Sequence, residues 1–178
     1  MEYIELFMKS NDLSNTEIYR LPRGYHFTYY LKGYETYWAD IESSVGEFSS
    51  KEKALKHFHE EFKDQTQALT KRCLFLVDQD RQFIGTTMAW FNDEGVGRLH
   101  WVAIKPEFQG QDLGKALVSK AVDVLGKYHQ EAYLTTQTTS YKAINLYLEL
   151  GFKPDIKTSE CRRGWKLVEE KLGKRIII

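Results

Sequence analysis

Residues 98–125 read RLHWVAIKPEFQGQDLGKALVSKAVDVL, and this stretch decides the fold of the chain. Residues 99–104 contain no glycine or proline and are rich in aromatic and β-branched side chains, which predicts a strand. Pro106 ends this strand, because proline cannot donate to a strand ladder. From Leu113 to Leu125 apolar residues recur at every fourth position, as they do on the buried face of a helix. The stretch therefore predicts a strand, a glycine-containing loop and a helix.

The loop between this strand and this helix is suited to binding an anion. The first amides of a helix have no partner within the helix, and together with the helix dipole they attract negative charge. Gly110 and Gly114 would let a phosphate approach the main chain closely. The glycine spacing, with Ala116 after Lys115, does not fit a Walker loop, and the dinucleotide pattern G-x-G-x-x-G is absent. The alternative is an ordinary strand-to-helix turn whose glycines serve only its geometry.

The composition of the 178-residue chain suits one domain with a sizeable core. Its 25 basic and 25 acidic side chains cancel, so neither a nucleic-acid surface nor a polybasic membrane patch is predicted. The two cysteines cannot form a disulfide framework, and no cysteine or histidine spacing fits a metal site, so we expect no metal. The acidic start is unlike a secretory signal, and no apolar run approaches the ~20 residues of a spanning helix. These features predict a cytoplasmic protein.

The remaining segments predict a mixed α/β domain. Ser49, followed three residues later by Glu52, reads as a capping box that starts a helix. Residues 63–72 either extend that helix or form a loop. Strands are expected at residues 25–31, 73–77, 83–91 and 132–136, with residues 3–8 as a further possibility, and helices at 34–45, 49–62, 143–150 and 165–172. Helices and strands in this order do not fit a strictly alternating parallel sheet.

Two motifs resemble those of the GNAT acetyltransferase superfamily. In its motif A, a strand is followed by Q/R-x-x-G-x-G/A at the start of a helix; Gln109 and Gly114 match, while Asp112 stands where the first glycine is usual. Residues 143–152, AINLYLELGF, match its motif B, A-x-x-L-Y-x-x-x-G-F, in full. The resemblance implies a central, mostly antiparallel sheet, splayed at a cofactor groove and flanked by helices. It covers residues 25–154, and leaves 1–24 as an N-terminal extension and 155–178 as a tail of a single domain, 1–178.

The resemblance further implies that acetyl-CoA binds as a cosubstrate. The backbone of the central strand would bond the pantetheine arm as an added strand does, and the loop amides would hold the pyrophosphate. Ser140 stands where the family often has an asparagine that contacts the cofactor; it could donate a shorter hydrogen bond there or serve only as a helix cap. Asn145 is a second candidate contact. The cofactor residues implied in this way are Val102, Ala103, Ile104, Gln109, Gly110, Gln111, Asp112, Leu113, Gly114, Lys115, Ser140 and Asn145.

By the same resemblance, Tyr147 lies near the sulfur of coenzyme A and protonates the leaving thiolate; the alternative is that it only packs. A base must also free the attacking amine of its proton. His100 has a suitable pKa range and shares a face with Val102 and Ile104 if no bulge intervenes, although it could equally be a satisfied histidine within a sheet. Glu47 is the other candidate base. Tyr37, Trp38, Glu47 and Phe48 would border the acceptor pocket.

The sequence thus predicts an N-acetyltransferase in which an amine of a small molecule or peptide attacks acetyl-CoA directly, in a monomer or a homodimer. Two alternatives stay open on the same fold: a non-catalytic module that binds acyl-CoA, and a protein-interaction domain. Asp112 and Ser140, which depart from the family pattern, are the residues that keep the protein-interaction alternative open.

Overall fold

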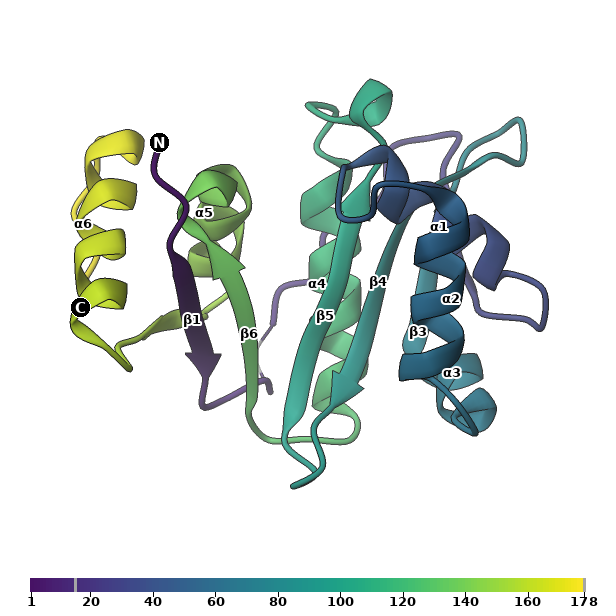
Figure 1. Cartoon of the computed structure of the whole chain (residues 1–178), viewed down its shortest axis with the longest axis horizontal. Helices are drawn as coiled ribbons and strands as arrows, with labels where there is room; N and C mark the ends of the chain where they lie inside the picture. The colour runs from purple at the N-terminus through teal and green to yellow at the C-terminus, as the bar shows by residue number, and fades with distance from the viewer. Residues whose placement is uncertain (15, 178) are drawn as a thin grey trace.

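The computed structural model describes residues 1–14 and 16–177, and its centre is a seven-stranded sheet (Figure 1). The strands are β1 (Glu5–Ser10), β2 (His26–Tyr29), β3 (Cys73–Val77), β4 (Phe83–Phe91), β5 (Gly97–Ile104), β6 (Ala132–Gln137) and β7 (Lys153–Asp155). Their order in the sheet is β2-β3-β4-β5-β6-β1-β7. Among the pairings of the described strands, only that of β5 with β6 is parallel. The predicted mixed, mostly antiparallel sheet is confirmed.

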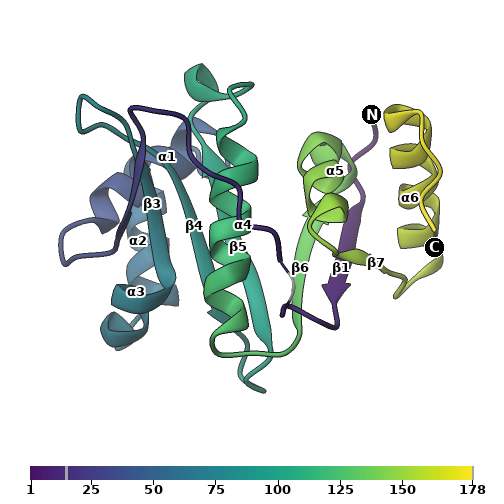
Figure 2. The same cartoon turned by 180° about the vertical axis from the view of Figure 1, so that it is seen from behind.

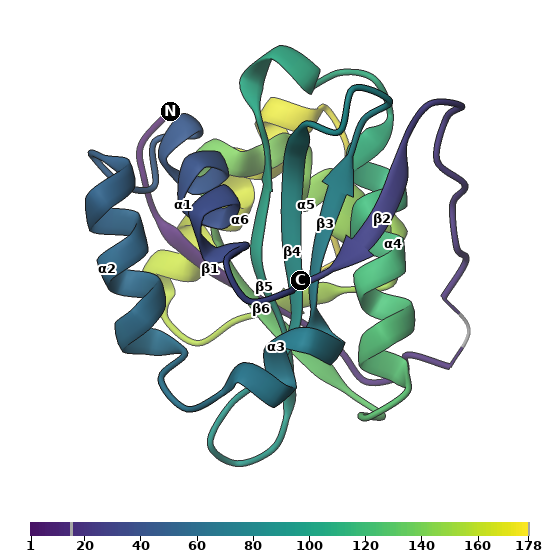
Figure 3. The ribbon, with the colours of Figure 1, turned by 90° about the vertical axis from the view of Figure 1, so that its right-hand side faces the viewer.

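Helices cover both faces of the sheet. They are α1 (Glu35–Ser44), α2 (Lys51–Glu61), α3 (Thr66–Arg72), α4 (Leu113–Gly126), α5 (Tyr141–Glu149) and α6 (Ser159–Leu172). Figure 3 shows α1 and α2 on one side of the sheet and α4 on the other. The start of α2 differs by one residue from the prediction, because Ser50 and not Ser49 is the N-cap and accepts a bond from the Lys53 amide. In the described chain no helix is both long and apolar enough to cross a bilayer.

The two ends of the chain complete the sheet rather than extending from it. β1 pairs antiparallel with β6 on one side and with β7 on the other. α6 packs on β1 and α5, as Figure 2 shows, and its Trp165 is fully buried. Gly164 allows this close packing, because a Cβ there would lie 2.9 Å from a methyl group of Leu6. The segments set apart from the family resemblance are therefore part of the same core.

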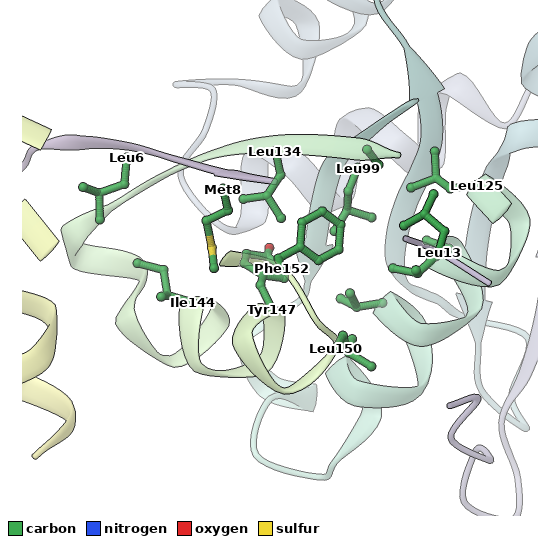
Figure 4. Packing of buried hydrophobic residues seen from close by; sticks show 14 of the residues in the cluster. Leu6, Met8, Leu13, Leu99, Leu125, Leu134, Ile144, Tyr147, Leu150 and Phe152 are labelled. Carbon is green, nitrogen blue, oxygen red and sulfur yellow. The ribbon is translucent and has the colours of Figure 1, made fainter. Parts of the chain in front are cut away.

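Apolar side chains form separate clusters on the two faces. On one face, Met8 of β1, Leu134 of β6 and Tyr147 of α5 meet Phe152 in a cluster that fixes α5 against the sheet (Figure 4). On the other face, Trp38 of α1 lies in a cluster with side chains of α2, β3 and β4. An ion pair of 2.7 Å between Lys105 and Asp40 also ties α1 to the end of β5. The helices on both faces are thus held at fixed positions beside β5.

β5 and β6 separate soon after they begin. Their ladder consists of Gly97 with Ala132 and Arg98 with Tyr133, and beyond these residues the strands diverge (Figure 1). The expected splay is confirmed. Its consequence is an edge of β5 that is not covered by its neighbour, where main-chain groups have no strand partner.

A β-bulge interrupts the other edge of β5. Thr86 of β4 pairs with Ala103, but Met88 pairs with His100, so β5 has an extra residue here and Trp101 has a φ of +48°. His100 and Trp101 consequently both reach Glu61 of α2, whereas Val102 packs on the opposite face. The prediction that His100 shares a face with Val102 depended on the absence of a bulge, and the bulge corrects it.

Candidate active site

Two adjoining cavities lie where β5 and β6 diverge. The long groove has a volume of about 560 Å³ and is lined by residues 102–104, 108–110, 113–114, 118, 139–143, 146 and 147. The small pocket has a volume of about 210 Å³ and is lined by residues 42, 47, 98–102, 134–137, 140, 143 and 147. Val102, Ser140, Ala143 and Tyr147 line both cavities. A ligand in the groove could therefore meet a second ligand in the pocket at these four residues.

The long groove combines a strand edge with a glycine turn. The end of β5 forms one wall, and the Gln109 side chain donates to the Ile104 carbonyl over 2.8 Å. Gly110 has a φ of +79°, a left-handed conformation that favours glycine. A Cβ on Gly114 would come within 3.7 Å of Leu146 and 3.8 Å of Ile104, across the groove. The missing side chain at residue 114 thus keeps the groove open beside the first turn of α4.

The departure of Asp112 from the family motif has a conformational explanation. Asp112 is the N-cap of α4 and has a φ of +58°, a left-handed conformation that favours glycine and that aspartate tolerates better than most residues. Its side chain is exposed and forms no capping hydrogen bond. The first amides of α4, at Leu113, Gly114 and Lys115, are therefore not capped by it, and they are the donors that an anion could use.

Eight of the twelve predicted cofactor residues line the long groove, namely Val102, Ala103, Ile104, Gln109, Gly110, Leu113, Gly114 and Ser140. Gln111, Asp112, Lys115 and Asn145 do not. Lys115 and Asn145 instead both bond Glu149, at 2.9 Å each, and Gln111 accepts a bond from the Tyr25 hydroxyl. The side chains of Gln111, Lys115 and Asn145 are therefore engaged elsewhere, although the amide of Lys115 is still at the helix start.

Tyr147 lies at the junction of the two cavities. It comes from α5, is 7% exposed, and packs against Phe152 with ring centres 6.4 Å apart (Figure 4). Burial raises the pKa of the Tyr147 hydroxyl, and the nearby Glu42 carboxyl raises it further. The hydroxyl is therefore protonated at neutral pH, so it can donate a proton or a hydrogen bond to a group in either cavity.

Glu61 of α2 organises one wall of the small pocket. Its carboxylate oxygens lie 2.8 Å from Nε2 of His100 and 2.9 Å from the indole N–H of Trp101, and His57 approaches to 3.0 Å. Burial opposes the ionisation of Glu61, but the bonds from His100 and Trp101 outweigh it and lower the pKa. Burial also lowers the pKa of His100, which is therefore neutral at pH 7. Its Nε2 is occupied by Glu61.

Glu42 is a site residue that the sequence analysis missed. It lies on α1, is 1% exposed, and its Oε1 atom has no hydrogen-bond partner among the described residues. Burial, together with the negative charges of Glu47 and Glu61, raises the pKa of Glu42 to about 8. A signal was present in the sequence, because Glu42 falls four residues after Trp38 and one after Ile41, on the apolar stripe of the helix.

Comparison with known proteins identifies the family of the chain. The model of the family described as "Acetyltransferase (GNAT) family" matches residues 22–152, most of the chain. The chain belongs to the GNAT acetyltransferase family. None of the curated proteins compared with it matches significantly.

Solved structures, among them GNAT acetyltransferases, share its fold. A GCN5-related N-acetyltransferase from Sphaerobacter thermophilus aligns with a TM-score of 0.67 at 21% identity, over 85% of this chain and 48% of the other. The protein PH1933 from Pyrococcus horikoshii OT3 aligns with a TM-score of 0.61 at 23% identity, over 76% and 93%. A putative GNAT acetyltransferase from Novosphingobium aromaticivorans gives 0.63 at 13%, over 87% and 62%. The chain thus spans about half to two thirds of the length of the first and third of these structures.

The four predicted acceptor residues of this GNAT domain have different environments. Glu47 is exposed and lines the small pocket. Trp38 is fully buried and packs edge-on against Trp101, and Phe48 packs between Trp38 and His57. Tyr37 stacks on Phe83 at 3.9 Å, outside both cavities. The prediction that Tyr37, Trp38 and Phe48 border the pocket is therefore corrected: Trp38 and Phe48 support Trp101, which does line it.

Metal-ion ligands are not gathered at this GNAT site. Among the residues that the structure describes, no group of three or more histidine, cysteine or carboxylate side chains is arranged to hold an ion. The ionisable groups of the small pocket are instead Glu42, Glu47, Arg98, His100 and Tyr147. These groups could move protons and bind charged ligands.

Proposed function

We propose that this GNAT domain transfers an acetyl group from acetyl-CoA to the amine of a small acceptor. The observation that carries the proposal is the junction of the two cavities at Tyr147. A long groove with an uncovered strand edge suits an extended cofactor, and a small pocket lined by the buried carboxyl group of Glu42 suits an amine. The fold and the family support the same reaction, while the acceptor is inferred from the pocket alone.

The residues present fit the cofactor at two places. Main-chain groups of residues 102–104 lie at the edge of β5 that β6 leaves uncovered, and would bond a pantetheine arm as a further strand. The uncapped amides at the start of α4 would bind a pyrophosphate, and Gly114 would admit it close to the helix. When bound, acetyl-CoA supplies a thioester that an amine can attack. Its sulfur would then lie near Tyr147.

Tyr147 and Glu42 would handle the protons. We assign to Glu42, in the ionised form that predominates above its pKa of about 8, the removal of a proton from the ammonium form of the acceptor, because Glu47 is exposed and Nε2 of His100 is bonded to Glu61. The neutral nitrogen then forms the C–N bond as the C–S bond breaks, and Tyr147 protonates the thiolate. The ammonium nitrogen loses two protons in all. One is balanced by the proton that the free thiol gains, and the other passes through Glu42 to solvent.

An assay of free thiol release tests the proposal. Acetyl-CoA is mixed with the protein and a panel of primary amines, and its affinity is measured in parallel by calorimetry. We expect binding and amine-dependent thiol release. Tyr147→Phe should lower kcat by about 100-fold or more while acetyl-CoA affinity stays unchanged, since general acid catalysis contributes roughly 10²–10⁴. Binding without thiol release for every amine would favour the alternative of a non-catalytic acyl-CoA-binding module.

A further inference from the structure

The small pocket is lined by a basic and an acidic side chain, each of which has a buried polar atom without a hydrogen-bond partner among the described residues. Nε of Arg98 and Oε1 of Glu42 are both buried without a hydrogen bond to any of the described residues. Both residues line the pocket, and within the part of the chain that is described they form no ion pair with each other within 4.0 Å. Buried polar atoms of this kind are destabilising when they stay unpaired. A ligand that carries both complementary charges would satisfy them together.

Arg98 lies where β5 and β6 are still paired, at the end of the pocket from which the two strands diverge. It belongs to the last paired residues of β5 and β6, and its guanidinium is 5.8 Å from the ring centre of Tyr133 across that pair. The opposite end of the pocket is the junction with the long groove at Val102 and Tyr147. A molecule that enters from the junction with its amine near the thioester would therefore extend its other end toward Arg98.

Charge and size restrict what that other end can be. A guanidinium matches the geometry of a carboxylate, to which it can donate two parallel hydrogen bonds. His100 is neutral, and Glu61 is already bonded to His100 and Trp101, so neither neutralises Arg98. The pocket volume of about 210 Å³ is below the range of about 300–1,000 Å³ typical for drug-sized ligands. The acceptor portion within it must therefore be small.

We propose that the acceptor is a small amine that also carries a carboxylate, with its carboxylate bound by Arg98 and its ammonium group by Glu42. This inference rests on the proposed acetyl transfer and names the substrate class of the same site. A polyamine would place additional positive charge beside Arg98, and an internal lysine of a peptide would leave that guanidinium without a partner. An amino acid with a free carboxylate pairs both side chains.

Matched acceptors test the inference. Glycine, β-alanine and 4-aminobutanoate are each compared with the corresponding carboxamide, which has nearly the same shape and no negative charge, by thiol release at saturating acetyl-CoA. For at least one of these amino acids, kcat/KM should exceed that of its carboxamide by roughly tenfold to a hundredfold, the effect of a hydrogen bond to a charged group. Calorimetric titration of the preferred amino acid into protein loaded with coenzyme A gives an independent measure of binding.

Two substitutions and a control locate the effect. Arg98→Met should reduce the ratio of kcat/KM for the amino acid to kcat/KM for its carboxamide to near one, and it should weaken binding of the amino acid in calorimetry. Arg98→Lys should retain part of this preference for the carboxylate. Arg162, an exposed arginine of α6, provides the matched control, and Arg162→Met should leave the preference intact. Coenzyme A affinity reports whether each variant is folded. If Arg98→Met does not fold, the wild-type preference and the Arg98→Lys variant still decide the question.

The outcomes separate this inference from the proposed function. Acetylation of carboxamides or other amines as efficiently as of every amino acid tested would overturn the role of Arg98 and leave acetyl transfer standing. A carboxylate preference that survives in Arg98→Met would also overturn it. Failure of every amine, amino acids included, to release thiol from bound acetyl-CoA would overturn the acetyl-transfer proposal itself, and this inference with it.

Discussion

Replacing Glu42 by glutamine should make the folded protein more stable at high pH while impairing catalysis. The carboxyl is 1% exposed, and burial together with Glu47 and Glu61 raises its pKa to about 8, from 4.5 for an ordinary glutamate. The folded state therefore retains a proton that the unfolded chain releases at lower pH. Stability must fall as pH rises from about 4.5 to about 8 and stay reduced above that range. Glutamine has nearly the same shape and does not ionise.

The size of the effect follows from the two pKa values. Full ionisation of Glu42 should reduce the free energy of unfolding by about 5 kcal/mol, at about 1.4 kcal/mol for each pH unit between them. Part of this loss is already present at about pH 5, so the advantage of Glu42→Gln should increase by about 4 kcal/mol from about pH 5 to about pH 9. Glu47, Glu61, Cys73 and Tyr147, which interact with Glu42 electrostatically, are present in both proteins and largely cancel in the comparison.

Urea unfolding followed by tryptophan fluorescence measures this difference at each pH. The variant should also lose roughly 100-fold or more in kcat/KM, as expected when a general base is removed, together with the part of the pH profile that rises near pH 8. Parallel stability curves for the two proteins, with the difference changing by less than about 1 kcal/mol over the whole range, would refute the reasoning, because Glu42 would then ionise as easily in the folded protein as in the unfolded chain.

Two further substitutions test the long groove. Gly114→Ala adds a methyl group that fits between Leu146 and Ile104, so urea unfolding should show a fold that is more stable by up to about 1 kcal/mol. Calorimetry should show that the same substitution weakens acetyl-CoA binding about tenfold. Unchanged affinity would mean that the pyrophosphate does not approach residue 114. Asp112→Gly removes a negative charge and a left-handed aspartate at the start of α4, so it should tighten acetyl-CoA binding by about twofold to fivefold at low salt and less at high salt. Asp64→Gly, at another exposed left-handed aspartate, is the matched control for Asp112→Gly and should leave the affinity unchanged.

The central strand, loop and helix were predictable because each depends on local sequence. Periodicity located α4, Pro106 marked the end of β5, and the residues of motif B fixed the position of Tyr147 on α5. The conformation of residue 112 was not predictable in the same way. Its left-handed φ is what makes glycine usual at that position of the motif, and the family pattern alone did not reveal this geometric reason.

The remaining features depend on contacts between distant segments. The bulge at Trp101 reflects the register of β4 against β5, and it places His100 on the face opposite to the one expected for a regular strand. Likewise, nothing local to residues 5–10 reveals that β1 inserts between β6 and β7. The sequence predicts Trp38 as an acceptor residue because its segment borders the site, yet its side chain is buried in the core. For Glu42 the sequence contained one indication, a carboxylate on the apolar stripe of a helix. Only the tertiary structure shows that its Oε1 atom has no hydrogen-bond partner among the described residues.

A crystal structure of the protein with acetyl-CoA tests the central claim most directly. The account predicts that the pantetheine arm pairs with the edge of β5 at residues 102–104, that the pyrophosphate contacts the first amides of α4, and that the thioester sulfur lies within hydrogen-bonding distance of the Tyr147 hydroxyl. Acetyl-CoA bound elsewhere, or bound in the groove with its sulfur far from Tyr147, would contradict it.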